Sequence, residues 1–174
     1  PVYYRGYEMV LNGTTEFEAI TGSSILQSAL ITFLIVELSK LFSNSDYLIG
    51  TNELGILYKK GSWLSTDIAV IRQESLKNYA ITNEYLKLPP ALVIEIDTKA
   101  DFSNFHTIPD YYNTKTQRLL DFGVENVVWI FTSSEKVMVA KKGQDWKTSD
   151  WNKTIDLIDG KSLDLKEILT KLKR

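Results

Sequence analysis

The stretch ALVIEIDTKADF, residues 91–102, combines an apolar β-strand with two carboxylates. Residues 91–96 form a short apolar run after a pair of prolines, a pattern typical of a strand inside a sheet. Side chains alternate along a strand, so Glu95 and Asp97 should share one face, about 7 Å apart. Because burying an unpaired carboxylate is costly, we expect these acids to be paired, bound to a metal or placed at a rim.

A second apolar strand with an acid at its beginning lies upstream, in the stretch STDIAVI of residues 65–71. Asp67 opens this strand. A single acid of this kind most often marks a strand end that reaches solvent. Two acidic strand ends in one small sheet favour a functional site more strongly, although they do not decide it.

The helix predicted from PDYYNTKTQRLLDFG, residues 109–123, carries a lysine on its apolar face. Tyr112, Lys115, Leu119 and Phe122 are spaced by three, four and three residues, which places them on one side of a helix. The lysine either extends its ammonium to water or neutralises the sheet acids. The presence of two inward carboxylates favours the second alternative.

The remaining elements surround these three. We expect one α/β (α+β) domain over residues 1–174, with a central mixed β-sheet flanked by α-helices. The other expected elements are two short strands around Asn12-Gly13, a helix from Ser23 or Ser24 to Phe42, strands at 47–50 and 55–58, a connection over 73–88 with one helical turn, a hairpin of ENVVWIFTS and KVMVAKKG, and a closing helix over 163–172.

Composition limits the classes of function. The chain has 174 residues, 44% of them hydrophobic, and a net charge of −2, so binding to nucleic acid would need a local basic patch. There is no cysteine and only one histidine, which excludes thiol nucleophiles and multi-histidine metal sites. Without a visible signal peptide or a membrane-length apolar run, we expect a soluble, cytoplasmic protein that contacts no membrane.

Four stretches taken in order resemble the bacterial Uma-type branch of restriction endonucleases, within the PD-(D/E)XK nuclease superfamily. They are STDIAVI, PPALVIEIDTKAD, KTQRLLDFGVENVVWIF and KVMVA, preceded by YEMVLNG…EFEAITGSS near the amino terminus. The resemblance covers most of the chain. It is the ordered set that is specific, since each piece alone is a weak signal.

This resemblance implies a restriction-endonuclease-like fold and magnesium-dependent cleavage of DNA. The strand aspartate of the family falls on Asp67 and its strand glutamate on Glu95. The helix lysine of this branch falls on Lys115. An early glutamate falls on Glu16, with Glu18 as the alternative.

The chemistry of phosphodiester cleavage explains why these residue types would be used together. A hard divalent cation screens the phosphate charge and lowers the pKa of a bound water. Asp67 and Glu95 would hold Mg²⁺, or Mn²⁺ in its place, and Asp97 would add a third oxygen. Lys115 would stabilise the charge that builds up on the phosphate.

The sequence also departs from the family pattern. Thr66 replaces the usual proline before the aspartate, Asp97 stands where a lysine is common, and Gln27 replaces a histidine. The alternative function is therefore a non-catalytic module with a nuclease fold that binds nucleic acid or protein. Lys99 is a rival for the lysine role, but an extended strand would place it about 13 Å beyond Glu95.

Other polar and aromatic residues carry weaker signals. His106 is more typical of a surface loop than of catalysis, and Glu53 could approach the metal from a hairpin. Trp146 and Trp151 are expected to cover the core or a sheet edge, with base stacking or a homodimer surface as the less favoured interpretation.

Overall fold

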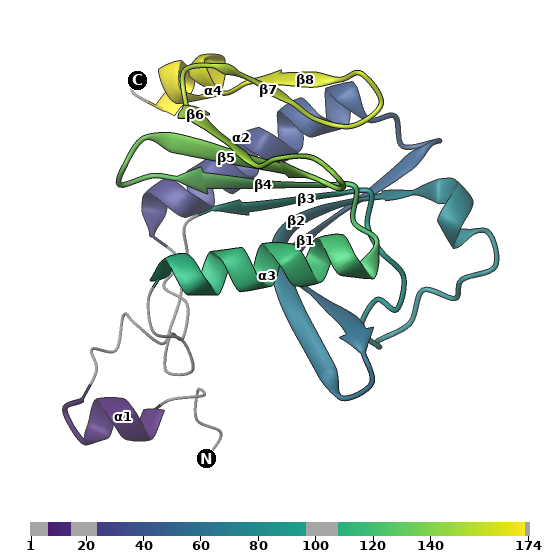
Figure 1. Cartoon of the computed structure of the whole chain (residues 1–174), viewed down its shortest axis with the longest axis horizontal. Helices are drawn as coiled ribbons and strands as arrows, with labels where there is room; N and C mark the ends of the chain where they lie inside the picture. The colour runs from purple at the N-terminus through teal and green to yellow at the C-terminus, as the bar shows by residue number, and fades with distance from the viewer. Residues whose placement is uncertain (1–6, 15–23, 97–107, 173–174) are drawn as a thin grey trace.

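The computed structural model describes residues 7–14, 24–96 and 108–172 (Figure 1). The helices are α1 (Tyr7–Leu11), α2 (Ile25–Leu41), the 3₁₀ turn η2 (Gln73–Leu76), α3 (Ile108–Phe122) and α4 (Leu165–Leu172). The strands are β1 (Tyr47–Lys59), β2 (Ser62–Arg72), β3 (Leu92–Ile96), β4 (Asn126–Phe131), β5 (Lys136–Lys141), β6 (Lys147–Asp150), β7 (Thr154–Asp156) and β8 (Ser162–Asp164). The predicted mixed α/β architecture is confirmed.

The main sheet has six strands in the order β1-β2-β3-β4-β5-β6. Four neighbouring pairs are antiparallel, whereas β3 and β4 are parallel. Parallel neighbours need a crossover connection, and the segment that contains α3 provides it. The strand with Glu95 therefore lies in the interior of the sheet, and the helix with Lys115 returns the chain to its neighbour.

Helix α2 covers one face of the sheet (Figure 1). It begins where expected, since the side chain of Ser24 accepts a hydrogen bond of 3.1 Å from the backbone N–H of Gln27. Leu30, Leu34 and Leu38 of its apolar stripe are fully buried. They belong to one hydrophobic cluster with the even-numbered residues of β3 and the inner face of α4.

Helix α3 covers the opposite face (Figure 1). It ends at Gly123, whose φ of +123° is a conformation that other residues rarely adopt. Leu119 and Leu120 pack into a second hydrophobic cluster with Val93 of β3 and Trp129 of β4. The alternation predicted for β3 is thus confirmed, and its odd-numbered residues face α3.

The expectation of two short strands around Asn12-Gly13 is wrong for the first of them. Residues Tyr7–Leu11 form helix α1. Asn12 and Gly13 end this helix, with Gly13 at a φ of +66° and its N–H bonded to the carbonyl of Val10. The turn signal was read correctly, but the apolar run before it is too short for its period to separate strand from helix. The second expected strand lies mostly outside the described residues.

The two strands expected at 47–50 and 55–58 form the single strand β1. Asn52 and Glu53, which read as a break, both have positive φ values and form a bulge opposite Asp67. A bulge inserts one extra residue and bends the strand without ending it.

The expectation that Asp67 opens its strand is wrong, because β2 begins at Ser62 and Asp67 lies in its middle, where it is buried. The remaining predicted elements are present with small shifts. β4 and β5 pair as the expected hairpin, and η2 is the helical turn of the connection. The closing helix begins at Leu165, because Leu163 belongs to β8. In the described ranges, no helix is long and apolar enough to cross a membrane.

Candidate active site

The two strand acids meet on the face of the sheet that α3 covers. Ile68 pairs with Ile94 in the antiparallel ladder of β2 and β3, so the next step places Asp67 opposite Glu95. One oxygen of Asp67 accepts a hydrogen bond of 2.8 Å from the backbone N–H of Ile96, which ties the two strands together. Asp67 is 8% exposed and Glu95 is 1% exposed.

Lys115 reaches these acids from the helix. Its Nζ lies 2.9 Å from Oε2 of Glu95, and the side chain of the lysine is almost fully buried. The same nitrogen lies 5.5 Å from the ring centroid of Trp129 and 5.8 Å from that of Tyr111. The helix therefore directs its ammonium onto the sheet and not to water.

The second carboxylate oxygen of Glu95 is the unusual atom of this cluster. Oε1 of Glu95 is buried and has no hydrogen-bond partner within the described part of the chain. Buried polar atoms are nearly always hydrogen-bonded, so an orphaned carboxylate oxygen is costly and calls for an explanation. A ligand that accepts a lone pair from this oxygen would remove the cost.

Burial and charge act against each other in this cluster. Burial raises the pKa of Glu95 to about 7, although the charge of Lys115 lowers it and the charge of Asp67 raises it further. Burial by itself would lower the pKa of Lys115, but the charge of Glu95 and the nearby Tyr111 outweigh it and raise that pKa above its usual value. Lys115 is therefore a permanent cation at neutral pH.

Of the aromatic residues around Lys115, Tyr112 was placed on its helix face from the sequence, but Trp129 and Tyr111 were not singled out. Trp129 pairs with Glu95 across the parallel strands, and its Nε1–H donates a hydrogen bond of 2.8 Å to the Thr116 hydroxyl. Tyr112 packs on Trp129 with ring centroids 5.8 Å apart. Side chains alternate between the two faces along β4, so Val127 and Trp129 face α3. This alternation was the sequence signal that could have placed Trp129 beside Lys115.

The residues present fit a hard divalent cation. Magnesium is commonly held by one or two carboxylates and keeps several of its waters. Asp67 and Glu95 supply two carboxylates, and Oε1 of Glu95 has its lone pairs unengaged by described residues. Among the described residues, no group of three or more histidine, cysteine or acidic side chains is suited to hold a metal. Asp97, the expected third oxygen ligand, lies outside the described residues.

This geometry can be set beside known proteins. A solved structure with the printed description "putative nuclease belonging to DUF820", from Anabaena variabilis, superposes on the chain with a TM-score of 0.71. The match covers 87% of this chain and 84% of the other, at 15% sequence identity. The chain has this nuclease-like fold. No protein-family model matches the sequence, and no curated protein does.

The nuclease-like fold confirms, at the level of architecture, the resemblance seen in the sequence. Of the predicted site residues, it brings together Asp67, Glu95 and Lys115. The others, Glu16, Glu18, Asp97, Lys99 and His106, lie outside the described residues.

The weaker sequence candidates do not join the cluster of Asp67, Glu95 and Lys115. Glu53 is exposed at the bulge of β1. Trp146 packs against the hydrophobic cluster under α3, and Trp151 packs against the cluster under α2. Both tryptophans therefore cover the core, the interpretation that the sequence favoured.

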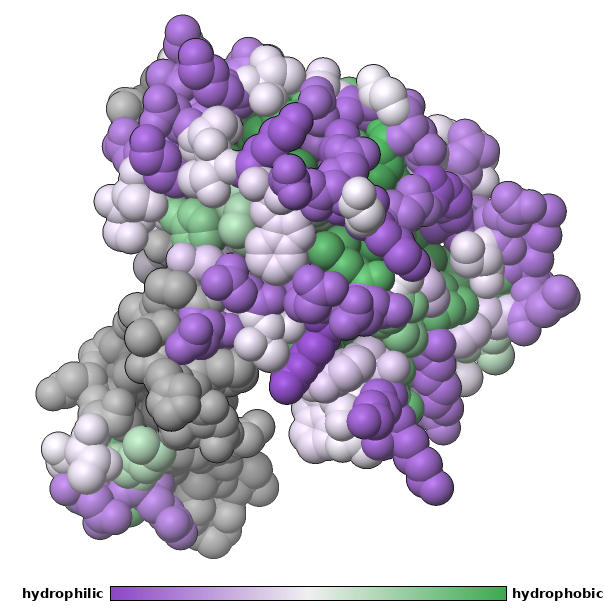
Figure 2. Space-filling view, viewed as in Figure 1, coloured by the Kyte–Doolittle hydropathy of each residue, from purple (hydrophilic) through white to green (hydrophobic). Residues whose placement is uncertain are grey.

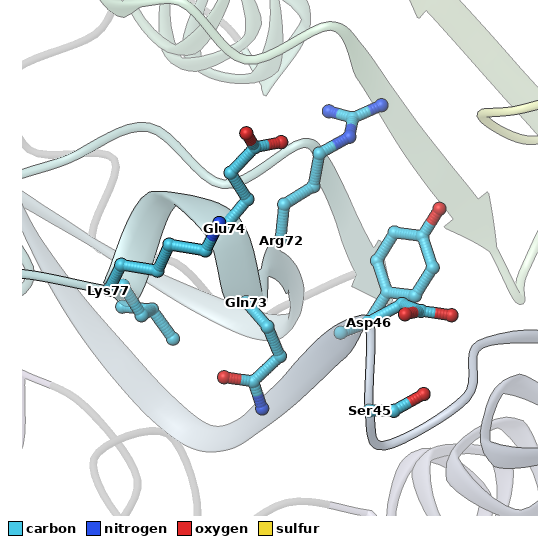
Figure 3. Close-up of a pocket in the computed structure, with 8 residues that line it drawn as sticks. Ser45, Asp46, Arg72, Gln73, Glu74 and Lys77 are labelled. Atoms are coloured by element: carbon cyan, nitrogen blue, oxygen red, sulfur yellow. The ribbon is translucent and has the colours of Figure 1, made fainter.

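A pocket of about 680 Å³ lies at the far end of β2, apart from the three site residues. Figure 3 shows Glu74 and Lys77 of the η2 region on one side of it and Asp46 on the other. Arg72 also lines the pocket, but its guanidinium is paired with Glu125 and with Asp159. A neutralised arginine and lining residues of mixed charge give this pocket no clear ligand.

Proposed function

We propose that the protein is a metal-dependent endonuclease that hydrolyses phosphodiester bonds in DNA. The observation that carries the proposal is the meeting of the helix lysine with two acids from separate strands in one cluster, where Oε1 of Glu95 has no described partner. The printed description of the structural neighbour as a nuclease supports the same class of function. DNA is proposed as the substrate because of the sequence resemblance to restriction endonucleases.

In this proposal, Asp67 and Glu95 hold the cation. Mg²⁺ or Mn²⁺ would screen the phosphate and lower the pKa of a bound water. Asp67 is fixed by its bond to the backbone of β3, so its orientation is set before substrate binds. Fixed carboxylates need no rearrangement during the reaction, which is the basis of preorganised catalysis.

Lys115 would contact the phosphate. Its ammonium is buried and held by Glu95, so it acts in surroundings where charge is weakly screened. The Trp129 ring, anchored through Thr116, lies beside this ammonium and fixes its position. A positioned cation of this kind stabilises the negative charge that develops on the phosphate oxygens.

The test is cleavage of supercoiled plasmid, single-stranded DNA and RNA by the purified protein with Mg²⁺, Mn²⁺ or EDTA. Cleavage of DNA with either cation is expected, with a loss of at least about 100-fold in Glu95→Gln, Asp67→Asn and Lys115→Met. Glu37→Gln is the matched control, because Glu37 also pairs with lysines but lies on α2. Full activity in all three site variants would contradict the proposal.

Metal binding gives a second measurement that does not depend on cleavage. Calorimetric titration with Mn²⁺ should show binding to the wild type and to Glu37→Gln, and much weaker binding to Glu95→Gln and Asp67→Asn. Lys115→Met should still bind, because it removes a positive charge and leaves both carboxylates in place.

The second candidate function is a non-catalytic module with the same fold. It is favoured by the depth of the cluster, since the side chains of Lys115 and Glu95 are only 5% and 1% exposed and already neutralise each other. A module of this kind would bind DNA without a divalent cation and would show no Mn²⁺ binding that depends on Glu95. The two titrations above therefore separate the candidates.

A further inference from the structure

Two large aromatic side chains are exposed side by side at the end of the β1–β2 hairpin. Trp63 on β2 is 55% exposed, and Tyr85 in the connection before β3 is 50% exposed. Their ring centroids are 6.3 Å apart, with planes inclined by 42°. Trp146 and Trp151 pack against the core, whereas Trp63 is more than half exposed to solvent.

The fold holds Tyr85 in place. The residue after it, Leu86, donates its N–H to Gly55 and accepts from the N–H of Leu57, at 2.9 and 2.8 Å. The ring then lies directly on Gly55, where a Cβ would come within 2.4 Å of a ring carbon. The glycine therefore permits an aromatic ring to lie against the backbone of β1, and the backbone bonds fix that ring beside Trp63.

The charge around the aromatic pair suits a polyanion. The hairpin residues 54–66 include Lys59 and Lys60, both exposed, and no acidic residue. Neither lysine has an ion-pair partner within the part of the chain that the structure describes. In the segment with Tyr85, Glu84 is paired with Lys87. The hairpin tip is thus locally basic on a chain whose net charge is −2, with Glu53 at the bulge as the flanking exposed acid.

The aromatic pair lies on the same strand as a site acid. Trp63 precedes Asp67 by four residues of β2, about 13 Å along the strand. Figure 1 shows the hairpin extending beyond α3, and Figure 2 shows hydrophilic residues over this end of the molecule. A strand of nucleic acid whose phosphate lies near Lys115 would reach the hairpin within a few nucleotides.

We infer that Trp63 and Tyr85 form a stacking platform for an unpaired nucleobase of single-stranded DNA, with Lys59 and Lys60 holding the adjacent phosphates. Exposed aromatic rings and a basic surface are the two elements of sequence-tolerant binding to single strands. The inference rests on the proposed function for its choice of partner. It adds that function's preferred substrate, DNA with an unpaired segment beside the cleavage point.

The test measures binding without catalysis. Fluorescence anisotropy of a labelled oligothymidylate is followed in EDTA with the wild type, Trp63→Ala, Trp63→Phe and Tyr85→Ala. Trp63→Ala should weaken binding at least about fivefold, and Trp63→Phe should restore most of it because phenylalanine also stacks. Val36→Ala on α2 is the control, since Val36 is similarly exposed but lies on another element. A duplex of the same length should bind more weakly than the single strand.

Two results would overturn the inference. One is equal affinity of Trp63→Ala and wild type for the oligonucleotide. Another is a wild-type dimer in sedimentation velocity that Trp63→Ala converts to monomer, because the patch would then be an interface between two copies.

The inference and the proposed function can fail separately. Stacking that depends on Trp63, without any metal-dependent cleavage, would leave the platform standing and contradict the nuclease proposal. Cleavage that is insensitive to Trp63→Ala, together with unchanged binding, would do the reverse.

Discussion

At the scale of single residues, the buried pair of Glu95 and Lys115 links the proposed function to stability. Both side chains are nearly inaccessible, and each is the main charge that the other faces. Removing one member of a buried pair leaves an uncompensated charge, which costs far more than losing a pair on the surface. Variants at this site should therefore be checked for stability before a loss of cleavage is assigned to chemistry.

A double-mutant cycle tests this coupling. Lys115→Met should lower the free energy of unfolding by about 3 kcal/mol, because Glu95 then has no cation and must take up a proton to stay buried. The double variant Lys115→Met/Glu95→Gln should lose clearly less than the sum of the two single variants. Urea unfolding followed by circular dichroism measures all four proteins.

The control cycle uses Lys171 and Glu37, which are 3.0 Å apart but more exposed. Its coupling should be below about 1 kcal/mol. Equal coupling in the two cycles would show that burial of the Glu95–Lys115 pair does not set its energy.

A second residue-scale prediction concerns Asp159. The Tyr47 hydroxyl donates a hydrogen bond of 2.6 Å to this carboxylate, which lowers its pKa, and Arg72 lowers it further. A carboxylate with a lowered pKa in the folded state adds stability above its unfolded pKa of about 3.9 and loses it as the pH falls below that value. Asp159→Asn should thus cost up to about 1 kcal/mol at pH 7, since the carboxylate is 38% exposed, and clearly less near pH 3.

Urea unfolding of wild type and Asp159→Asn at both pH values measures this difference. Tyr47→Phe is the companion variant, since it removes the hydroxyl donor and keeps the ring that packs on Phe42. A cost of Asp159→Asn that stays constant between the two pH values would show that the ionised carboxylate is not the stabilising form.

At the scale of elements, the β1–β2 hairpin brings the aromatic pair and a site acid onto one unit. β1 bends at Asn52 and Glu53, opposite Asp67, and continues to the hairpin tip at Gly61. The segment with Tyr85 then pairs with the edge of β1 at Ile56. A change in this edge pairing should therefore move the Tyr85 ring and leave Asp67 and Glu95 in place.

Gly55→Ala tests the edge pairing. The new Cβ would lie within 2.4 Å of the Tyr85 ring, so the ring must move off the strand and away from its position beside Trp63. Affinity for single-stranded DNA should fall about as much as in Tyr85→Ala, while binding of Mn²⁺ stays unchanged. In a Tyr85→Ala background the same substitution should have little further effect on affinity, and a large additional loss there would contradict the steric argument.

The long elements were predictable because periodicity and caps agree in them. Ser24 and the leucine stripe identified α2, and the three-four-three spacing around Lys115 identified the face of α3 that meets the sheet. α1 was missed because five residues cannot display a helical period clearly. The continuity of β1 was missed because two residues with positive φ resemble a turn in the sequence and are a bulge in the fold.

The site was predictable in part. Alternation along β3 and spacing along one helix face are local information, and they predicted that Glu95 and Lys115 face each other. Asp67 was added by the ordered resemblance to known nucleases. The exposure of Trp63 could not be predicted from the sequence, because it depends on which tryptophans pack into the core once the fold has formed. Tyr85 reaches Trp63 only through a backbone pairing between residues 30 apart.

At the scale of the whole molecule, the charge distribution decides how DNA would bind. A net charge of −2 repels a polyanion, so association must depend on local lysines. There are two adjacent pairs of basic residues, Lys59 and Lys60 at the hairpin, and Lys141 and Lys142 at the end of β5. Only the first pair lies beside exposed aromatic rings.

Salt dependence distinguishes the two pairs. Each phosphate contact to a single strand contributes about 0.7 to the slope of log K against log salt concentration. Lys59→Gln/Lys60→Gln should therefore reduce the slope for oligothymidylate by about 1.4, and Lys141→Gln/Lys142→Gln should leave it unchanged. Anisotropy titrations between low and moderate salt measure the slope, and identical slopes for the two double variants would refute the assignment.

The packing of α2 against α4 also has a consequence for the order of folding, because it closes one of the two hydrophobic clusters. The apolar stripe of α2 comes before the sheet in the chain, but part of its cover comes from Ile155, Leu163 and Ile168, which follow the sheet. If α4 has not yet formed, part of the hydrophobic face of α2 stays exposed to solvent. Exposed hydrophobic surface of this kind promotes aggregation and chaperone binding. The α2 face of the sheet is therefore fully covered only when the segment from β7 to α4 has folded onto it.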